Sequence, residues 1–164
     1  MSNYKANSTN SLNFELTYNN KKIGELIYGK WYSFNANIHL FNGDKLKLEP
    51  KGFWNSKVEL KNTENILLEF KMGWNGIIIK TFFNNKEENY LLTQKGLLSN
   101  KFILLDTEKN EILVAESNFK WKNLNYDYNI ETSQKFDNTP NKDILILTIL
   151  HCINYYITII VSAG

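Results

Sequence analysis

Residues 144–163 read ILILTILHCINYYITIIVSA, a run of twenty residues without a charged side chain. Such a run is long enough to cross a membrane as a helix. Its polar members are spaced three, three and four residues apart and therefore form one stripe along a helix: Thr148, His151, Asn154 and Thr158. A polar stripe is costly against lipid. We therefore expect a helix over about residues 140–162 that is enclosed by protein.

The residues before this run suit the start of a helix. Pro140 is compatible with a first helical turn, and Asp143 would face the positive end of the helix dipole. A helix that is apolar nearly all round is buried either in a large core or in a membrane. The alternative to a protein core is therefore a C-terminal membrane anchor.

Between Leu12 and about Ile130 the chain reads as short strands separated by turns. The clearest alternation is Phe34–Leu40, in which Phe34, Ala36, Ile38 and Leu40 share one face and Asn35, Asn37 and His39 share the other. Turn signals rich in Asn, Asp and Gly fall between the runs, at 19–20, 42–44, 62–65, 84–85 and 106–110. This pattern predicts a series of β-hairpins.

The tryptophans mark a weak internal repeat. Trp31, Trp54, Trp74 and Trp121 are separated by 23, 20 and 47 residues. One repeat is about the length of a hairpin with its connection, and a hairpin cannot bury its face alone. Closure of the sheet removes exposed edges, and a barrel of ten or more strands has a lumen that must be filled.

We therefore predict a mainly β fold: a closed antiparallel β-barrel of hairpin repeats around a buried C-terminal apolar helix. Residues 12–164 form a single barrel domain in this prediction. Residues 1–11 are polar, and we expect them to be a disordered lead-in.

This combination of hairpins and helix resembles the Tubby C-terminal-like superfamily, which includes the LURP-one-related and phospholipid-scramblase proteins. The resemblance covers roughly residues 12–162 and is carried by three stretches: the strand pairs at 37–46 and 101–113, and the apolar stretch at 136–161 led by Asp143. It implies a closed barrel threaded by its C-terminal helix and an activity at membranes, such as phosphoinositide binding. The chain lacks the arginine, the acidic calcium-binding run and the cysteine cluster that such relatives use.

Composition narrows the partners and the chemistry. The net charge is +2, and all 19 basic residues are lysine. Without arginine, sequence-specific reading of nucleic acid is not expected. Cys152 is the single cysteine, so no intramolecular disulfide can form. No catalytic or nucleotide-binding motif occurs. The chain shows no apolar signal-peptide core in residues 1–11, so we expect a cytoplasmic protein.

His151 and Cys152 are adjacent and would point about 100° apart on a helix. This geometry does not suit a shared metal or a nucleophile with its base. We therefore expect structural roles for both, with His151 hydrogen-bonded inside the barrel or at its mouth. No catalytic residue, metal site or cofactor is predicted.

Two segments that mix lysine with large rings are the candidate ligand-binding residues: Lys51, Trp54 and Lys57, and Lys120, Trp121 and Lys122. Such mixtures bind anionic headgroups or single-stranded nucleic acid. The alternative, which we favour on general grounds, is that the tryptophans pack in the core and the lysines are their solvated neighbours.

These observations lead to a non-catalytic binding module of unknown ligand. Its partner would be an anionic phospholipid at a membrane surface or another protein. Two alternatives stay open: a tail-anchored membrane protein with a cytoplasmic β domain, and an enzyme whose site is not recognisable from motifs.

Overall fold

The computed structural model describes residues 1–30, 34–52, 56–96, 99–122 and 124–163, the last four of these as backbone only. Within these residues the strands are β1 Ser2–Ser8, β2 Phe14–Tyr18, β3 Lys21–Tyr28, β4 Ala36–Leu40, β5 Lys45–Lys51, β6 Lys57–Lys61, β7 Ile66–Gly73, β8 Gly76–Thr81, β9 Glu88–Gln94, β10 Lys101–Leu105, β11 Glu111–Lys120 and β12 Asn125–Thr132. The helices are η2 Phe83–Asn85, α1 Gln134–Asp137 and α2 Lys142–Ala163.

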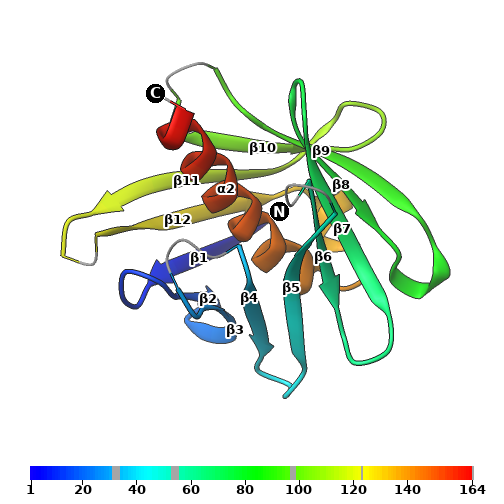
Figure 1. The fold of residues 1–164 in the computed structure, drawn as a ribbon, viewed down its shortest axis with the longest axis horizontal. Coiled ribbons are helices and arrows are strands. Elements are labelled where there is room, and N and C mark those ends of the chain that lie inside the picture. Colours follow the sequence, from blue (N-terminus) through cyan, green and yellow to red (C-terminus); the bar gives the residue numbers. More distant parts are fainter. Residues whose placement is uncertain (31–33, 53–55, 97–98, 123, 164) are drawn as a thin grey trace.

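These twelve strands, counted over the described residues, form one closed antiparallel barrel (Figure 1). Each strand pairs with its neighbours in sequence, and β1 pairs with β12 to close the sheet. Closure leaves no unpaired strand edge. The prediction of a closed antiparallel barrel is confirmed.

The alternation read from the sequence appears directly in the barrel wall. In β4, Ala36 and Ile38 are buried while Asn37 is exposed. The same pattern runs through β2 and β5, where Phe14, Leu16, Leu46 and Leu48 face the interior. Side chains of a strand alternate between its two faces, so one face of each strand contributes to the lumen.

The start of the chain differs from the prediction. Residues 1–11, expected to be a disordered lead-in, contain β1, which pairs with β12 on one side and β2 on the other. Its inward positions are Tyr4, Ala6 and Ser8, of which only the tyrosine is large. The apolar signal is therefore weak in the sequence, and the strand is fixed by backbone pairing with residues more than 120 positions away.

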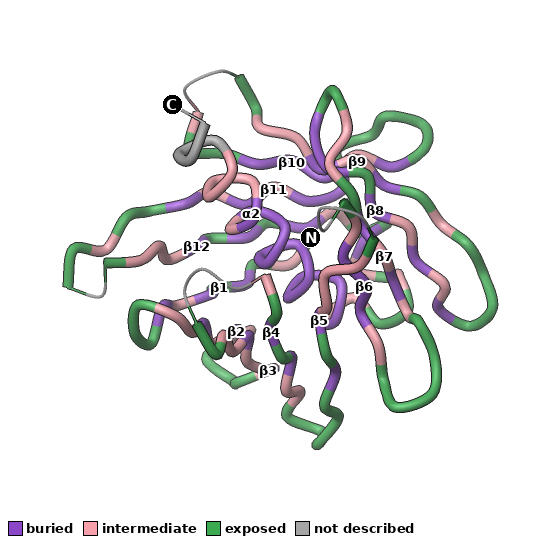
Figure 2. Tube along the Cα trace, in the orientation of Figure 1, coloured by how far each residue is buried: buried purple, intermediate pink, exposed green. Residues whose placement is uncertain are grey.

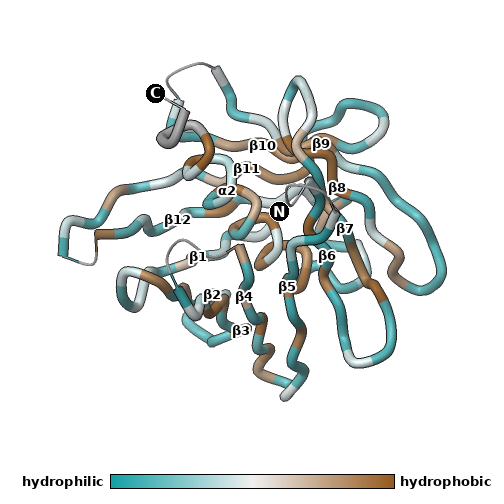
Figure 3. The backbone as a smooth tube through the Cα atoms, viewed as in Figure 1, coloured by the Kyte–Doolittle hydropathy of each residue, from teal (hydrophilic) through white to brown (hydrophobic). Residues whose placement is uncertain are grey.

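Helix α2 fills the lumen, as predicted, and runs along the inside of the barrel (Figures 1 and 2). Residues 144–153 of the helix are all buried, and Leu145, Ile146, Leu147, Leu150, Cys152 and Ile153 are fully inaccessible to solvent. Burial of one such aliphatic side chain stabilises the fold by about 1.5–3 kcal/mol. Figure 3 shows hydrophobic residues along α2 and along the strand segments that surround it.

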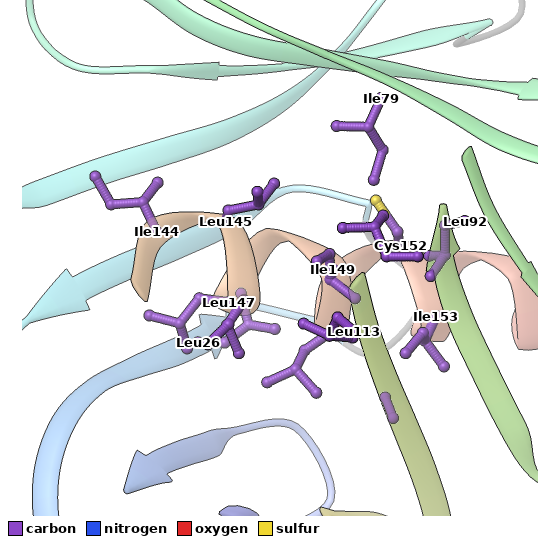
Figure 4. Packing of buried hydrophobic residues seen from close by; sticks show 14 of the residues in the cluster. Leu26, Ile79, Leu92, Leu113, Ile144, Leu145, Leu147, Ile149, Cys152 and Ile153 are labelled. Carbon is purple, nitrogen blue, oxygen red and sulfur yellow. The ribbon is translucent and has the colours of Figure 1, made fainter. Parts of the chain in front are cut away.

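The contacts of α2 come from all sides of the barrel. Leu147 lies beside Leu26 of β3, and Cys152 lies beside Ile79 of β8 (Figure 4). Leu113 of β11 also faces the helix. A helix surrounded in this way has no free apolar face over its first half, which explains why its sequence is apolar nearly all round.

Among the described residues, α2 is the one helix long and apolar enough to cross a membrane. However, 61% of the window Lys142–Ile159 is buried inside the barrel. The interior of the barrel therefore provides the apolar surroundings that such a helix needs.

Candidate binding site at the mouth of the barrel

The barrel has two ends that differ in composition. Because consecutive strands are antiparallel, alternate connections lie at the same end. One end, here called the mouth, is formed by connections 9–13, 29–35, 52–56, 74–75, 95–100 and 121–124. The other end, called the base, is formed by connections 19–20, 41–44, 62–65, 82–87 and 106–110. Helix α2 follows β12 at the base and runs toward the mouth.

The two ends also differ in charge. By sequence, the mouth connections contain three lysines, Lys30, Lys95 and Lys122, and no Asp or Glu. The base connections contain five acidic residues and two lysines: Asp44, Glu64, Glu87, Asp106 and Glu108, with Lys86 and Lys109. By sequence, the mouth connections are therefore net positive and the base connections net negative. Among these residues, Lys95 is paired with Glu111, and Asp106 and Glu108 are paired with Lys135.

Large apolar side chains are exposed at the mouth. Trp74, in the β7–β8 turn, is fully exposed, and Trp121 and Leu124, in the β11–β12 turn, are 80% and 68% exposed. At the base, Phe41 is the comparable exposed side chain in a described connection. Trp31 and Trp54 lie outside the described residues. The two described tryptophans therefore both lie in turns at the mouth.

A cavity of about 440 Å³ opens at the mouth, beside the second half of α2. The helix contributes His151, Asn154, Tyr155, Ile157 and Thr158, and the wall and connections contribute Ser11, Leu12, Phe14, Tyr28, Phe34, Leu124, Asn125 and Tyr126. Its volume is in the range of small-molecule sites. None of these lining residues carries a formal charge at neutral pH, apart from the titratable imidazole considered below.

A hydrogen-bond network connects the helix to the wall of this cavity. The Tyr28 hydroxyl lies 2.7 Å from Nδ1 of His151 and accepts a hydrogen bond from Nδ2 of Asn154 at 3.2 Å. The Tyr128 hydroxyl donates to Oδ1 of Asn154 at 2.9 Å. The two polar helix residues are therefore linked through a tyrosine of β3.

The network is electrically neutral. Burial lowers the pKa of His151 to about 3, so the imidazole is uncharged at physiological pH. The Phe34 carbonyl is near enough to oppose this lowering in part, but Nε2 makes no hydrogen bond of good geometry within the described part of the chain. Burial also raises the pKa of the Tyr28 and Tyr128 hydroxyls. The prediction that His151 is hydrogen-bonded inside the barrel or at its mouth is confirmed.

A row of aromatic rings leads from the exposed rim to this network. The rings of Trp121 and Phe119 have centroids 5.0 Å apart, and Phe119 and Tyr126 are 5.2 Å apart. Tyr126 is in turn 6.3 Å from Tyr128, the partner of Asn154. These separations are those of interacting aromatic pairs. The row gives the cavity a rigid apolar margin on the β11–β12 side.

The two lysines of the first predicted segment form ion pairs with carboxylates. Lys51 ends β5 and lies 3.2 Å from Glu49, and Lys57 begins β6 and contacts both Glu59 and Glu69. The hydrogen bonds from Lys61 and Lys57 lower the pKa of Glu59. These lysines therefore add little net positive charge, and Trp54 between them lies outside the described residues.

The second predicted segment lies on the other side of the barrel. Lys120 ends β11 and forms an ion pair with Asp127 at 2.9 Å, whereas Trp121 and Lys122 are exposed in the turn. Four strands separate β6 from β11, so the two predicted segments share the mouth but do not form one site. The interpretation that the tryptophans pack in the core is wrong for Trp121. This residue lies in the turn between β11 and β12, beyond the barrel wall, and its side chain is exposed.

Among the described residues, no arrangement of side chains suits metal binding or nucleophilic catalysis. No group of three or more His, Cys, Asp or Glu side chains there is placed to hold a metal ion. The sulfur of Cys152 lies beside Ile79, and burial raises the pKa of its thiol (Figure 4). Adjacent positions on a helix face different directions, as the sequence indicated.

The polar stripe of α2 was visible in the sequence, but its partners were not. Tyr28 and Tyr128 are separated from Asn154 by 126 and 26 residues, and nothing local marks them as its partners.

No protein-family model matches the chain, and comparisons with curated proteins and with solved structures gave no match. The resemblance to the Tubby C-terminal-like superfamily therefore stays a prediction.

Proposed function

We propose that the protein is a non-catalytic binding module that associates peripherally with an anionic membrane through the mouth of its barrel. The observation that carries this proposal is the asymmetry of the two ends. Exposed Trp74, Trp121 and Leu124 lie at the end whose connections contain lysine but no acidic residue. Tryptophan is enriched at the membrane–water interface because its ring is amphipathic.

The energetics of such an association are modest and additive. A lysine near an anionic leaflet contributes about 1 kcal/mol, and this term falls within a Debye length of the surface. Insertion of exposed apolar rings supplies a second term that depends on buried area. The cytoplasmic leaflet is the one rich in anionic lipid, so a cytoplasmic protein would meet a suitable surface. The acidic base would then face away from the membrane.

This proposal differs from a tail anchor in the role of α2. A membrane-spanning α2 would have to leave the barrel and expose the lumen residues that now contact it, such as Leu26 and Ile79. The energetic cost would be that of the whole core. We therefore propose binding by the mouth connections with α2 retained inside. Catalysis is not proposed, because the buried His151 network contains no group placed as an activated nucleophile.

The test is sedimentation with lipid vesicles in the absence of detergent. We expect the full chain to sediment with vesicles of phosphatidylcholine and phosphatidylserine at low salt, and to be released as salt rises. The double variant Trp74→Ser with Trp121→Ser should bind at least about tenfold more weakly, because both rings leave the interface. Phe41→Ser is the matched control, since it removes an equally exposed ring from the base.

Three outcomes would contradict the proposal. The first is that the full chain fails to sediment with anionic vesicles at low salt. The second is that the double variant binds as tightly as the unaltered chain. The third is that the Phe41→Ser control loses as much binding as the double variant, which would mean that the mouth has no special role. The first outcome would instead direct attention to a protein partner for the exposed rings.

A further inference from the structure

The cavity beside the second half of α2 is lined by uncharged residues and is built from both the helix and the barrel wall. Phe14, Phe34, Tyr126 and Tyr155 provide aromatic surface, and Leu12, Leu124 and Ile157 provide aliphatic surface. Binding sites for small molecules are typically apolar with a few convergent polar groups. Here the polar groups converge on one residue, Asn154, which lies between the Tyr28 and Tyr128 hydroxyls.

The network leaves a hydrogen-bond donor free within the described part of the chain. A side-chain amide has two N–H groups, and Asn154 uses one of them for Tyr28 while Oδ1 accepts from Tyr128. Asn154 is only partly buried and lines the cavity. Behind it, Nε2 of the buried His151 has no hydrogen-bond partner of good geometry among the described residues. A ligand oxygen that accepts a hydrogen bond would therefore meet a donor at this point.

Charge selects between ligands that carry such an oxygen. No lysine lines the cavity, and His151 is neutral. A carboxylate or phosphate placed there would lose its hydration without gaining a cation, which is costly. A hydroxyl, ester or amide oxygen has no such penalty. The exposed lysines of the mouth are not among the lining residues.

We propose that this cavity binds an uncharged amphiphile, a molecule with a hydroxyl or other neutral oxygen on an aliphatic chain. The oxygen accepts a hydrogen bond from Nδ2 of Asn154, and the chain lies against the aromatic and aliphatic walls that open at the mouth. The row from Tyr126 to Trp121 continues this apolar wall to the rim. The inference goes beyond membrane association and does not require it, because the cavity is present in the protein alone.

The experiment compares octan-1-ol with octanoate, which share a chain length and differ in headgroup charge. Binding is measured in solution, without vesicles, by calorimetry and by NMR spectra of the ¹⁵N-labelled full chain at pH 7. We expect octan-1-ol to bind at least about tenfold more tightly than octanoate, because only the anion loses hydration without compensation. The side-chain amide signal of Asn154 should shift on addition of the alcohol.

Ile157→Trp fills the cavity and should weaken octan-1-ol binding at least about tenfold, because the bulkier ring occupies the volume of the chain. Ile66→Trp is its matched control, since Ile66 is a partly exposed isoleucine outside the cavity, at the start of β7. Circular dichroism establishes that both variants fold. If Ile157→Trp does not fold, Leu124→Asn replaces it. Leu124 is an exposed rim residue at a positive φ of 49°, which asparagine tolerates, and its loss should also weaken binding.

The proposal would be overturned if octan-1-ol does not bind the unaltered chain, if octanoate binds as tightly, or if the cavity variant binds like its control. These outcomes are separable from those of the vesicle test. Alcohol binding without vesicle sedimentation would support the cavity and remove the membrane proposal. Vesicle sedimentation without alcohol binding would support the membrane proposal and remove the cavity proposal.

Discussion

The hydroxyl of Tyr28, on the barrel wall, lies 2.7 Å from Nδ1 of His151, on the central helix. The contact joins residues 123 positions apart in the sequence and ties the second half of α2 to β3. Together with the bond from Asn154 to the same hydroxyl, it fixes how the helix is rotated inside the barrel. Polar groups buried in this way specify one packing, because any rotation of the helix would leave them unpaired.

Removal of the Tyr28 hydroxyl tests this role. Tyr28→Phe keeps the ring but leaves Nδ1 of His151 and Nδ2 of Asn154 without their partner. We expect the free energy of unfolding, measured in urea, to fall by about 1–3 kcal/mol. Tyr18→Phe is the control, since the half-buried Tyr18 packs on Tyr4 and its hydroxyl makes no hydrogen bond with the described residues. It should change stability by less than about 0.5 kcal/mol. Equal losses in the two variants would show that the network does not anchor the helix.

The depressed pKa of His151 predicts how stability depends on pH. Burial lowers this pKa from 6.5 to about 3, so between pH 6.5 and 3 His151 takes up a proton in the unfolded chain but not in the folded chain. The contribution of His151 to the free energy of unfolding is fully present above pH 6.5. It is lost as the pH falls toward 3, with a slope of at most about 1.4 kcal/mol per pH unit. The neighbouring Tyr28 and Cys152 do not titrate in this window, because burial raises their pKa values.

The slope is measured from urea unfolding between pH 6.5 and 5, above the ordinary pKa values of Asp and Glu side chains. Burial raises the pKa of Asp143, so the imidazole's share is taken as the difference between the unaltered chain and a His151 variant that keeps Asp143. His151→Asn should reduce the slope there, whatever its effect on absolute stability. An unchanged slope in this variant would mean that His151 is not the group responsible. An NMR titration gives a second readout, since the imidazole signals of His151 should stay constant between pH 7 and 5.

Truncation after Lys142 tests whether α2 is the core of the barrel. The shortened chain loses the buried residues from Ile144 to Ile153, which fill the lumen. We expect it to aggregate or to unfold without a cooperative transition, while the full chain is soluble without detergent and melts cooperatively. If the truncated chain folds alone and the full chain requires detergent, α2 is a membrane anchor and the buried position is wrong.

Most of the fold was predictable because its strands and its long helix each give a periodic pattern of apolar and polar residues. Alternation of period two in stretches such as Phe34–Leu40 gives strands, and a long uncharged run with one polar stripe gives a helix buried in protein. β1 was missed because Ala6 and Ser8 are too small to give an apolar signal. Its position depends on pairing with β12, a long-range contact that no local pattern reveals.

The candidate site was predictable only in part. The polar stripe of α2 identified His151 and Asn154, but the hydroxyls that bind them come from distant strands. The two lysine–aromatic segments both lie at the mouth. The pairs of Lys57 with Glu69 and of Lys120 with Asp127 cross between neighbouring strands and needed the register, whereas Glu49 and Glu59 lie two residues from Lys51 and Lys57 on the same strand. The contrast between mouth and base depends on knowing which connections share an end, and it therefore required the topology.

The most direct test of the account asks which end of the barrel meets the membrane. Cys152 is fully buried, so an environment-sensitive fluorophore can be attached to a single introduced cysteine. Asn75→Cys places it in the β7–β8 turn at the mouth, and Glu64→Cys places it in the β6–β7 turn at the base, both at exposed positions. On addition of phosphatidylserine-containing vesicles, the account predicts a blue shift of the emission for the label at position 75 and none at position 64. A shift at position 64 alone, or at both positions equally, would contradict it.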